Sequence, residues 1–178
     1  MIRVFNYHPA EKRLESGGPE LIEVWAASPD ALLWADFGDE PEGSERAMLI
    51  GRFGLHPLAV SDAQRRRHPP KFERFADHSF LLLRGLDAGT DNVEFGTLQI
   101  ALFVGERFLV TRHQEVSLGI DGVCRELRED PAPLAEGTEL LALRITRRVA
   151  DRYLPILLDL ETRLDKIEDD MQENPNDR

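Results

Sequence analysis

The sequence has a single cysteine and no long apolar run, and these two absences exclude whole classes of protein. With Cys124 alone, the chain can form no internal disulfide and no cysteine-rich zinc site. A membrane span would need about 18 consecutive apolar residues. No such run occurs, and the first residues, MIRVFNYHPAEKR, lack the apolar core of a signal peptide. We therefore expect no segment of this chain to cross a membrane. We expect Cys124, on the apolar side of a predicted helix, to be buried and inert.

Positive charge is also scarce. Lys and Arg number 22 against 33 Asp and Glu, which gives a net charge of −11 over 178 residues. Such a surface repels phosphates, so we predict no nucleic-acid partner. It attracts cations or a basic partner instead, although an acidic balance can also serve solubility alone. Composition leaves these two interpretations open.

The motifs of common catalytic sites are missing as well. The sequence has no glycine-rich phosphate loop, no His-Glu-x-x-His, no Gly-x-Ser-x-Gly and no paired cysteines. No histidine lies three or four residues from another, as a zinc site on one helix would often require. We predict that the chain is not an enzyme. We interpret the histidines as turn or capping residues: His8, His56, His68, His78 and His113.

Up to residue 137, the sequence alternates between strand and helix patterns. We predict strands at 2–7, 21–25, 31–37 and 79–86, and a hairpin over 93–113 that turns at Gly105 and Glu106. We predict helices at 38–54, with Ser44 as the N-cap and Gly54 as the stop, and at 119–127. Residues 8–20 and 129–137 have the composition of turns or loops. The pattern predicts an α/β domain over 1–137, with a mixed sheet sandwiched between helices.

From Thr138 the pattern changes to one long helical segment over 138–178. Apolar residues recur there at alternating spacings of three and four, the heptad pattern of a helix that packs along another helix. These residues form the seam: Ala150, Tyr153, Leu157, Leu160, Leu164, Ile167 and Met171. The outer face is acidic towards the end, with Asp165, Glu168, Asp169 and Asp170. Pro155 is expected to kink this helix or mark a junction. No segment of the chain repeats the seam, so we expect another chain or a further segment to cover it.

Residues 54–75 hold the candidate binding residues. Pro57 suits the first turn of a helix in which Leu58, Ala59 and Val60 pack inward, and Asp62 then lies near the helix end. Because the helix dipole favours cations at that end, a carboxylate there suggests a task beyond capping. Mg²⁺ keeps several waters and is often held by only one or two carboxylates. Asp62 is therefore a candidate half-site that a neighbouring chain would complete.

The run Arg65, Arg66 and Arg67 follows directly. It lacks the interleaved aromatic residues on which single-stranded nucleic acid stacks. The run can be interpreted as a solvated turn or as a set of ion pairs with acidic neighbours. If it has a function, we expect these arginines to form ion pairs between subunits.

Four segments in order resemble a known family. LHPLAVSDAQRRRHPPKFERFADHSFLLLRGL, preceded by WADF and followed by LQIALFVGERFLVTRH and RVADRYLPILLDLETRLDKIEDDM, resembles the N-terminal cytoplasmic domain of CorA-type divalent cation transporters. The resemblance runs from about Leu32 to Met171. It implies a pentameric inner-membrane transporter for Mg²⁺, often also passing Co²⁺ or Ni²⁺, whose cytosolic funnel is an α/β/α sandwich. It also implies that the acidic helix pairs with a following helix and leads to stalk and transmembrane regions, all outside this chain.

In that family, the aspartate matching Asp62 helps to form a regulatory Mg²⁺ site between protomers. Many members carry an acidic residue where this chain has Ser61, and that departure weakens the site or removes a ligand. The resemblance implies a homo-oligomer on the cytoplasmic face of the inner membrane that senses intracellular cations through carboxylates between protomers. A Zn²⁺-transporting relative of the same fold, or a soluble adaptor domain that uses the arginine run and the acidic helix, remain alternatives.

Overall fold

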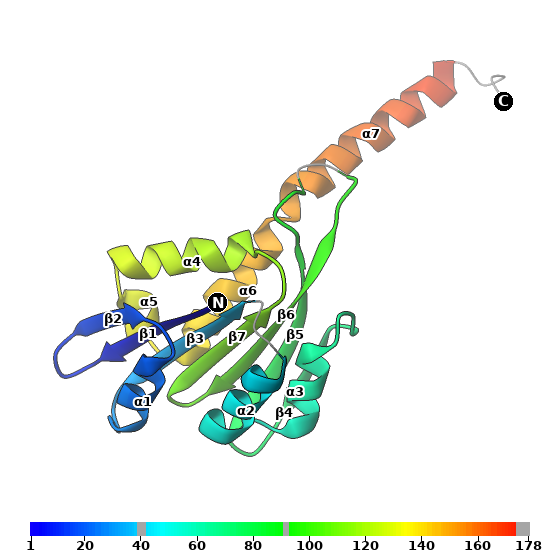
Figure 1. Ribbon diagram of the computed structural model, residues 1–178. Helices are drawn as coiled ribbons and strands as arrows, with labels where there is room; N and C mark the ends of the chain where they lie inside the picture. The colour runs from blue at the N-terminus through cyan, green and yellow to red at the C-terminus, as the bar shows by residue number, and fades with distance from the viewer. Residues whose placement is uncertain (39–41, 91–92, 174–178) are drawn as a thin grey trace.

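The computed structural model describes residues 1–38, 42–90 and 93–173, and its centre is a seven-stranded sheet (Figure 1). The strand order is β2-β1-β3-β7-β6-β5-β4. The strands are β1 (Ile2–His8), β2 (Arg13–Gly17), β3 (Leu32–Gly38), β4 (Lys71–Arg74), β5 (His78–Leu86), β6 (Thr97–Gly105) and β7 (Phe108–His113). β3 and β7 run parallel, while the other paired strands run antiparallel. The sheet is therefore mixed, as the sequence predicts.

Helices cover both faces of this sheet. One face carries α1 (Glu20–Ala26), α2 (Glu42–Phe53) and α3 (Pro57–Gln64). The other carries α4 (Leu118–Glu129), α5 (Ala132–Ala135) and α6 (Thr138–Asp151). Each face has its own apolar cluster, so β3 is buried on both sides: Leu33 and Phe37 belong to one cluster and Trp34 to the other. The predicted α/β sandwich is confirmed.

The last helix, α7 (Leu154–Glu173), projects away from the sandwich (Figure 1). The predicted long helix breaks at Arg152 and Tyr153, and Pro155 lies in the first turn of α7, where its missing N–H costs no helical hydrogen bond. Pro155 therefore marks a junction, as predicted. α6 packs against the sheet through Leu141 and Ile145. The division of the chain at residue 137 stays a prediction.

Along α7, the predicted seam is exposed. Leu157, Leu160, Leu164, Ile167 and Met171 are between 43% and 68% accessible to solvent. No helix among the described residues is both long enough and apolar enough to span a membrane. Cys124 lies buried in the apolar cluster beneath α4 and α6, as predicted.

Three predicted secondary structures are wrong. Residues 21–25 lie in helix α1 and not in a strand, because Ile22 and Trp25, three residues apart, both face the sheet. The predicted turn over 8–20 contains β2, an edge strand whose exposed residues show no apolar alternation. The predicted loop over 129–137 contains α5, since prolines fit the first turn of a helix.

Local details differ in two further places. The hairpin begins at Thr97, four residues later than predicted. Gly105 is the last residue of β6, so the hairpin turns at Glu106 and Arg107, one residue later than predicted. Ser44 is the third residue of α2 and not its N-cap, and residues 39–41 of the predicted helix lie outside the described residues. Gly54 does follow the helix end, with a φ of 65° that favours glycine.

Candidate functional site

Helix α3 carries Asp62 to the surface of the sandwich. His56 precedes the helix, and its Nδ1 accepts a hydrogen bond of 3.3 Å from the backbone N–H of Leu58, while Pro57 fills the first helical position. Ala59 and Val60 are buried, as predicted, but Leu58 is 70% exposed because it lies on the outer side of the helix. Asp62 lies in the last turn, where the sequence places it.

Two side chains from the sheet hold the end of α3. Gln99 Nε2 on β6 donates to the carbonyl oxygens of Asp62, Ala63 and Arg65 at 2.9–3.1 Å. Arg112 Nη1 on β7 donates to the Ala63 carbonyl at 2.8 Å. Arg112 also forms a buried ion pair of 3.1 Å with Glu45 of α2. Because these donors satisfy carbonyls that have no partner within the helix, they fix the backbone beside Asp62.

Strand β4 brings a lysine onto the Asp62 carboxylate. Alternate residues of a strand share a face, so Lys71 and Glu73 both lie on the half-buried side of this edge strand. Lys71 Nζ is 2.6 Å from Asp62 Oδ2 and 2.9 Å from Glu73 Oε1. The ammonium therefore lies between two carboxylates.

Two further basic groups lie near the other oxygen of the same carboxylate. Arg65 Nη1 is 3.3 Å from Asp62 Oδ1, and His68 Nε2 is 3.7 Å from it. We call Asp62, Arg65, His68, Lys71 and Glu73 the Asp62 cluster. Its members come from the C-terminal end of α3, from β4 and from the loop between them.

Each charged group of the Asp62 cluster favours the ionised form of its oppositely charged partners. Burial alone would raise the pKa of Asp62, but the Lys71 hydrogen bond and the nearby positive charges outweigh it, and the pKa lies below its ordinary value. Burial would likewise lower the pKa of Lys71, yet its bonds to Asp62 and Glu73 raise that pKa above its ordinary value. Both groups are therefore charged near neutral pH.

The donor set of the Asp62 cluster suits a hard divalent cation in part. Asp62 and Glu73 offer carboxylate oxygens, the ligands that Mg²⁺ prefers. Within this chain, the Lys71 ammonium lies against both of them. No group of three or more His, Cys, Asp or Glu side chains that could hold a metal ion occurs in the part of the chain that the structure describes. The predicted half-site, which needs a neighbouring chain, stays a prediction.

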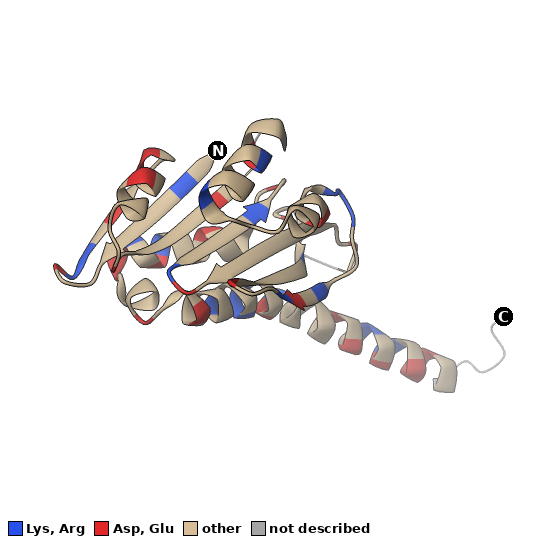
Figure 2. Cartoon of the chain, turned by 90° about the horizontal axis from the view of Figure 1, so that it is seen from below, with Lys and Arg blue, Asp and Glu red and all other residues tan. Residues whose placement is uncertain are grey.

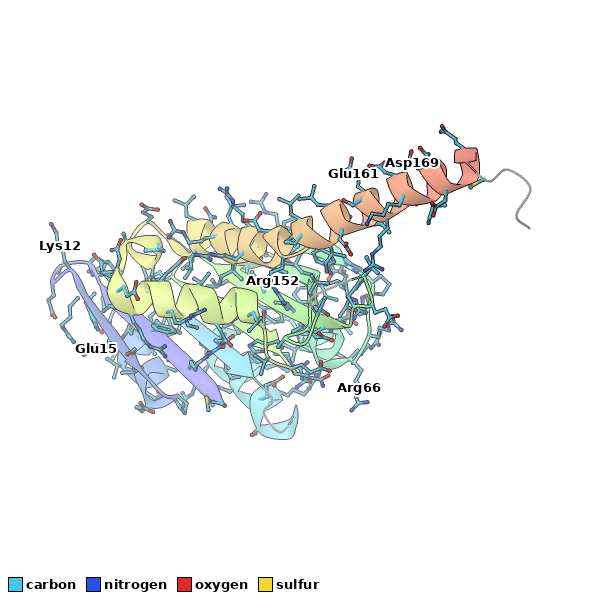
Figure 3. The ribbon with its side chains drawn as sticks, turned by 90° about the horizontal axis from the view of Figure 1, so that it is seen from above. Lys12, Glu15, Arg66, Arg152, Glu161 and Asp169 are labelled. Carbon is cyan, nitrogen blue, oxygen red and sulfur yellow. The ribbon has the colours of Figure 1, made fainter. Side chains whose placement is uncertain are left out.

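The other predicted site residues lie apart from this cluster or at its rim. Arg65, Arg66 and Arg67 are exposed in the loop after α3, and Arg66 points away from the body of the protein (Figure 3). Asp165, Glu168, Asp169 and Asp170 are exposed on α7, where acidic residues recur along the helix (Figure 2). Their roles as interface and cation-binding residues stay predictions.

A second ionic cluster, not predicted from the sequence, lies at the carboxyl ends of β3 and β7. Arg3 Nη2 is 2.6 Å from Asp36 Oδ2, and His113 Nε2 is 3.2 Å from Asp36 Oδ1. Arg3 Nη1 also contacts Asp121 Oδ1 at 2.6 Å, and Thr111 Oγ1 donates to Asp36 at 2.5 Å. All of these residues except Thr111 border a cavity of about 250 Å³. We call Arg3, Asp36, His113, Thr111 and Asp121 the Asp36 cluster.

The Asp36 cluster corrects the interpretation of the histidines. His8, His78 and His113 lie within β1, β5 and β7, so none of them is a turn or capping residue. His56 is a cap and His68 lies in the loop after α3, as predicted. Burial would raise the pKa of Asp36, but the hydrogen bond and charge of His113, with Arg3 and Thr111, hold that pKa below its ordinary value. Burial would lower the pKa of His113, but Asp36 and the Glu115 carbonyl raise it. The one signal in the sequence is Asp36 itself, a carboxylate within an otherwise apolar strand.

The fold resembles that of two solved domains, the soluble domain of CorA and the ZntB cytoplasmic domain. The soluble domain of CorA from Methanocaldococcus jannaschii matches 97% of this chain and 65% of that chain, with a TM-score of 0.68 and 18% sequence identity. The ZntB cytoplasmic domain from Vibrio parahaemolyticus RIMD 2210633 matches 97% of this chain and 64% of that chain, with a TM-score of 0.60 and 15% identity. At these identities the likeness shows the fold alone.

Sequence comparison shows the family. The model described as "CorA-like Mg2+ transporter protein" matches residues 29–178, so the chain belongs to this family, and the predicted resemblance is confirmed. The putative metal ion transporter YfjQ of Bacillus subtilis (strain 168) is 32% identical over 142 residues, which cover 79% of this chain and 43% of YfjQ. The chain thus spans less than half the length of this curated relative.

Proposed function

We propose that the chain is the cytosolic regulatory domain of a homopentameric divalent cation transporter, with Mg²⁺ as cargo and Co²⁺ or Ni²⁺ also accepted. Membership of the CorA-like family carries this proposal, and the likeness to a putative metal ion transporter supports it. The membrane-spanning part lies outside this chain in the proposal, and the domain faces the cytoplasm at the inner membrane. Family membership also favours transport over catalysis and over a soluble adaptor role.

The regulatory role follows from charge. Several copies of a chain with a net charge of −11 repel one another when they form a ring. Divalent cations that bridge carboxylates of adjacent protomers relieve this repulsion and stabilise a symmetric closed state. Asp62 and the acidic residues of α7 supply those carboxylates in the proposal. A cation shifts the equilibrium only as far as it prefers the bridged state, so loss of the cation favours opening.

The test compares Asp62→Asn with the unchanged protein in the whole transporter. Limited proteolysis is followed as Mg²⁺ rises, and the variant should need a higher Mg²⁺ concentration for half-maximal protection, because one bridging carboxylate has lost its charge. Asp30→Asn, which neutralises an exposed aspartate in the turn before β3, is the matched control. An unchanged midpoint for Asp62→Asn would show that Asp62 is not a sensor ligand.

Zn²⁺ is a second candidate cargo, because the resemblance to CorA-type transporters extends to Zn²⁺-transporting relatives of the same fold. The two cargoes are separated by measuring uptake of Mg²⁺ and of Zn²⁺ by vesicles that contain the whole transporter. Uptake of Zn²⁺ without Mg²⁺ would overturn the magnesium assignment and leave the structural role of this domain intact.

A further inference from the structure

Lys71 is held in place by three groups. Its ammonium contacts Asp62 at 2.6 Å and Glu73 at 2.9 Å, and it lies 5.4 Å from the ring centroid of Phe80 on β5. The ring face attracts a cation in this position. A positive charge is thereby held between two carboxylates.

The carboxylate and the ammonium differ in how easily they can move. Asp62 belongs to a helix end whose backbone is clamped by Gln99 and Arg112. Lys71 reaches the cluster through a flexible four-carbon stem, and its side chain is 21% exposed. The ammonium can therefore swing into solvent while the Asp62 carboxylate stays where it is.

We propose that Lys71 is a tethered cation that competes with divalent cations for Asp62 and Glu73, and so sets the concentration at which this position binds a divalent ion. The regulatory role of this competition rests on the proposed function, whereas the competition for Asp62 and Glu73 itself does not. A divalent ion that reaches Asp62 must displace the ammonium. In its absence, Lys71 neutralises the carboxylate and limits the repulsion that Asp62 would add between protomers.

The test uses the 178-residue chain and MgCl₂ alone. Backbone amide NMR shifts of α3 and β4 are followed as Mg²⁺ is added to the unchanged chain, to Lys71→Met and to the double variant Lys71→Met/Asp62→Asn. Methionine keeps much of the apolar stem and removes the charge. Signal dispersion in the same spectra checks that each variant is folded.

We expect Lys71→Met to lower the Mg²⁺ concentration for half-maximal shift at α3 and β4 roughly three- to fivefold, in the range of a partly exposed ion pair. The double variant should lose that gain. Lys12→Met is the matched control, because it removes the same charge from the turn between β1 and β2, at the opposite edge of the sheet (Figure 3). It should leave the α3 and β4 response unchanged.

Three results would overturn the competition. The absence of a Mg²⁺-dependent shift at α3 and β4 in both the unchanged chain and Lys71→Met would show that Asp62 and Glu73 of this chain hold no divalent ion. Equal midpoints for the unchanged chain and Lys71→Met would show that the ammonium does not compete. A gain that survives in the double variant would show that the ion binds elsewhere. These results are independent of the proteolysis test: an Asp62-dependent gain in the chain, with no Asp62 effect in the transporter, would keep the competition and reject the sensing role.

Discussion

Asp36 and Asp62 are both paired with basic side chains of their own chain, yet their surroundings differ. The Asp36 side chain is 1% exposed and its partners come from β1 and β7, whereas the Asp62 side chain is 15% exposed and its basic partners lie within nine residues of it. The Asp36 pairs join neighbouring strands of the sheet that lie far apart in the sequence. The Asp62 pairs are local and reach solvent. The first cluster is therefore suited to holding the fold, and the second to exchanging its cation.

The sharpest way to test this comparison is to remove the buried carboxylate. Asp36→Ala should lower the free energy of unfolding by about 3–5 kcal/mol, because it leaves the charges of Arg3 and His113 without their shared partner. Urea unfolding followed by circular dichroism measures the change. Asp30→Ala, at an exposed position, is the control and should have little effect. A loss below about 1 kcal/mol for Asp36→Ala would contradict a structural role for the Asp36 cluster.

The pH dependence of stability should reveal the same cluster with a smaller effect. Both ring nitrogens of His113 face acceptors, Asp36 Oδ1 at 3.2 Å and the Glu115 carbonyl at 2.6 Å, so the folded state favours the protonated ring despite the opposing charge of Arg3. A raised pKa in the folded state stabilises the protein fully below the unfolded pKa of about 6.5. That contribution is lost as the pH rises through the folded pKa.

The measurement for this second prediction is urea unfolding at a series of pH values above and below 6.5. The free energy of unfolding should fall as the pH rises across this window. His113→Gln should flatten the decline, since glutamine does not titrate. A decline of the same steepness in His113→Gln would assign the pH dependence to other groups.

Much of the fold could be predicted because burial marks the sequence clearly. β1, β3 and β5 are largely apolar segments of a sheet that helices cover on both faces. In α4 the apolar residues recur at helical spacing because they all face one apolar cluster. The missed elements lack that signal. α1 is too short for its period to be distinguished from alternation, and β2 is an exposed edge strand whose pairing with β1 comes from the turn between them.

The candidate site was predictable only in part. Pro57 places the start of α3 and hence the position of Asp62, since both depend on local helix geometry. The contact between Lys71 and Asp62 depends on the pairing of β4 with β5 at the edge of the sheet, and no pattern in the sequence predicts that pairing. In the sequence, Asp36 lies 33 positions from Arg3 and 77 positions from His113. The geometry of the Asp36 cluster therefore forms only when β1, β3 and β7 are paired.

The smallest expected effect belongs to the Asp62 side of the comparison. Asp62→Ala should change the free energy of unfolding by less than about 1 kcal/mol, because a partly exposed pair gains little over its hydrated groups. A double-mutant cycle with Lys71→Met isolates the pair from the rest of the cluster, and its coupling energy should lie in the same small range. A small coupling energy between Lys71 and Asp62 means that a divalent ion can displace the ammonium from the carboxylate at little cost in free energy. A coupling energy near that of the buried pairs, about 3 kcal/mol or more, would make Lys71 a structural partner of Asp62 and remove the distinction between the two clusters.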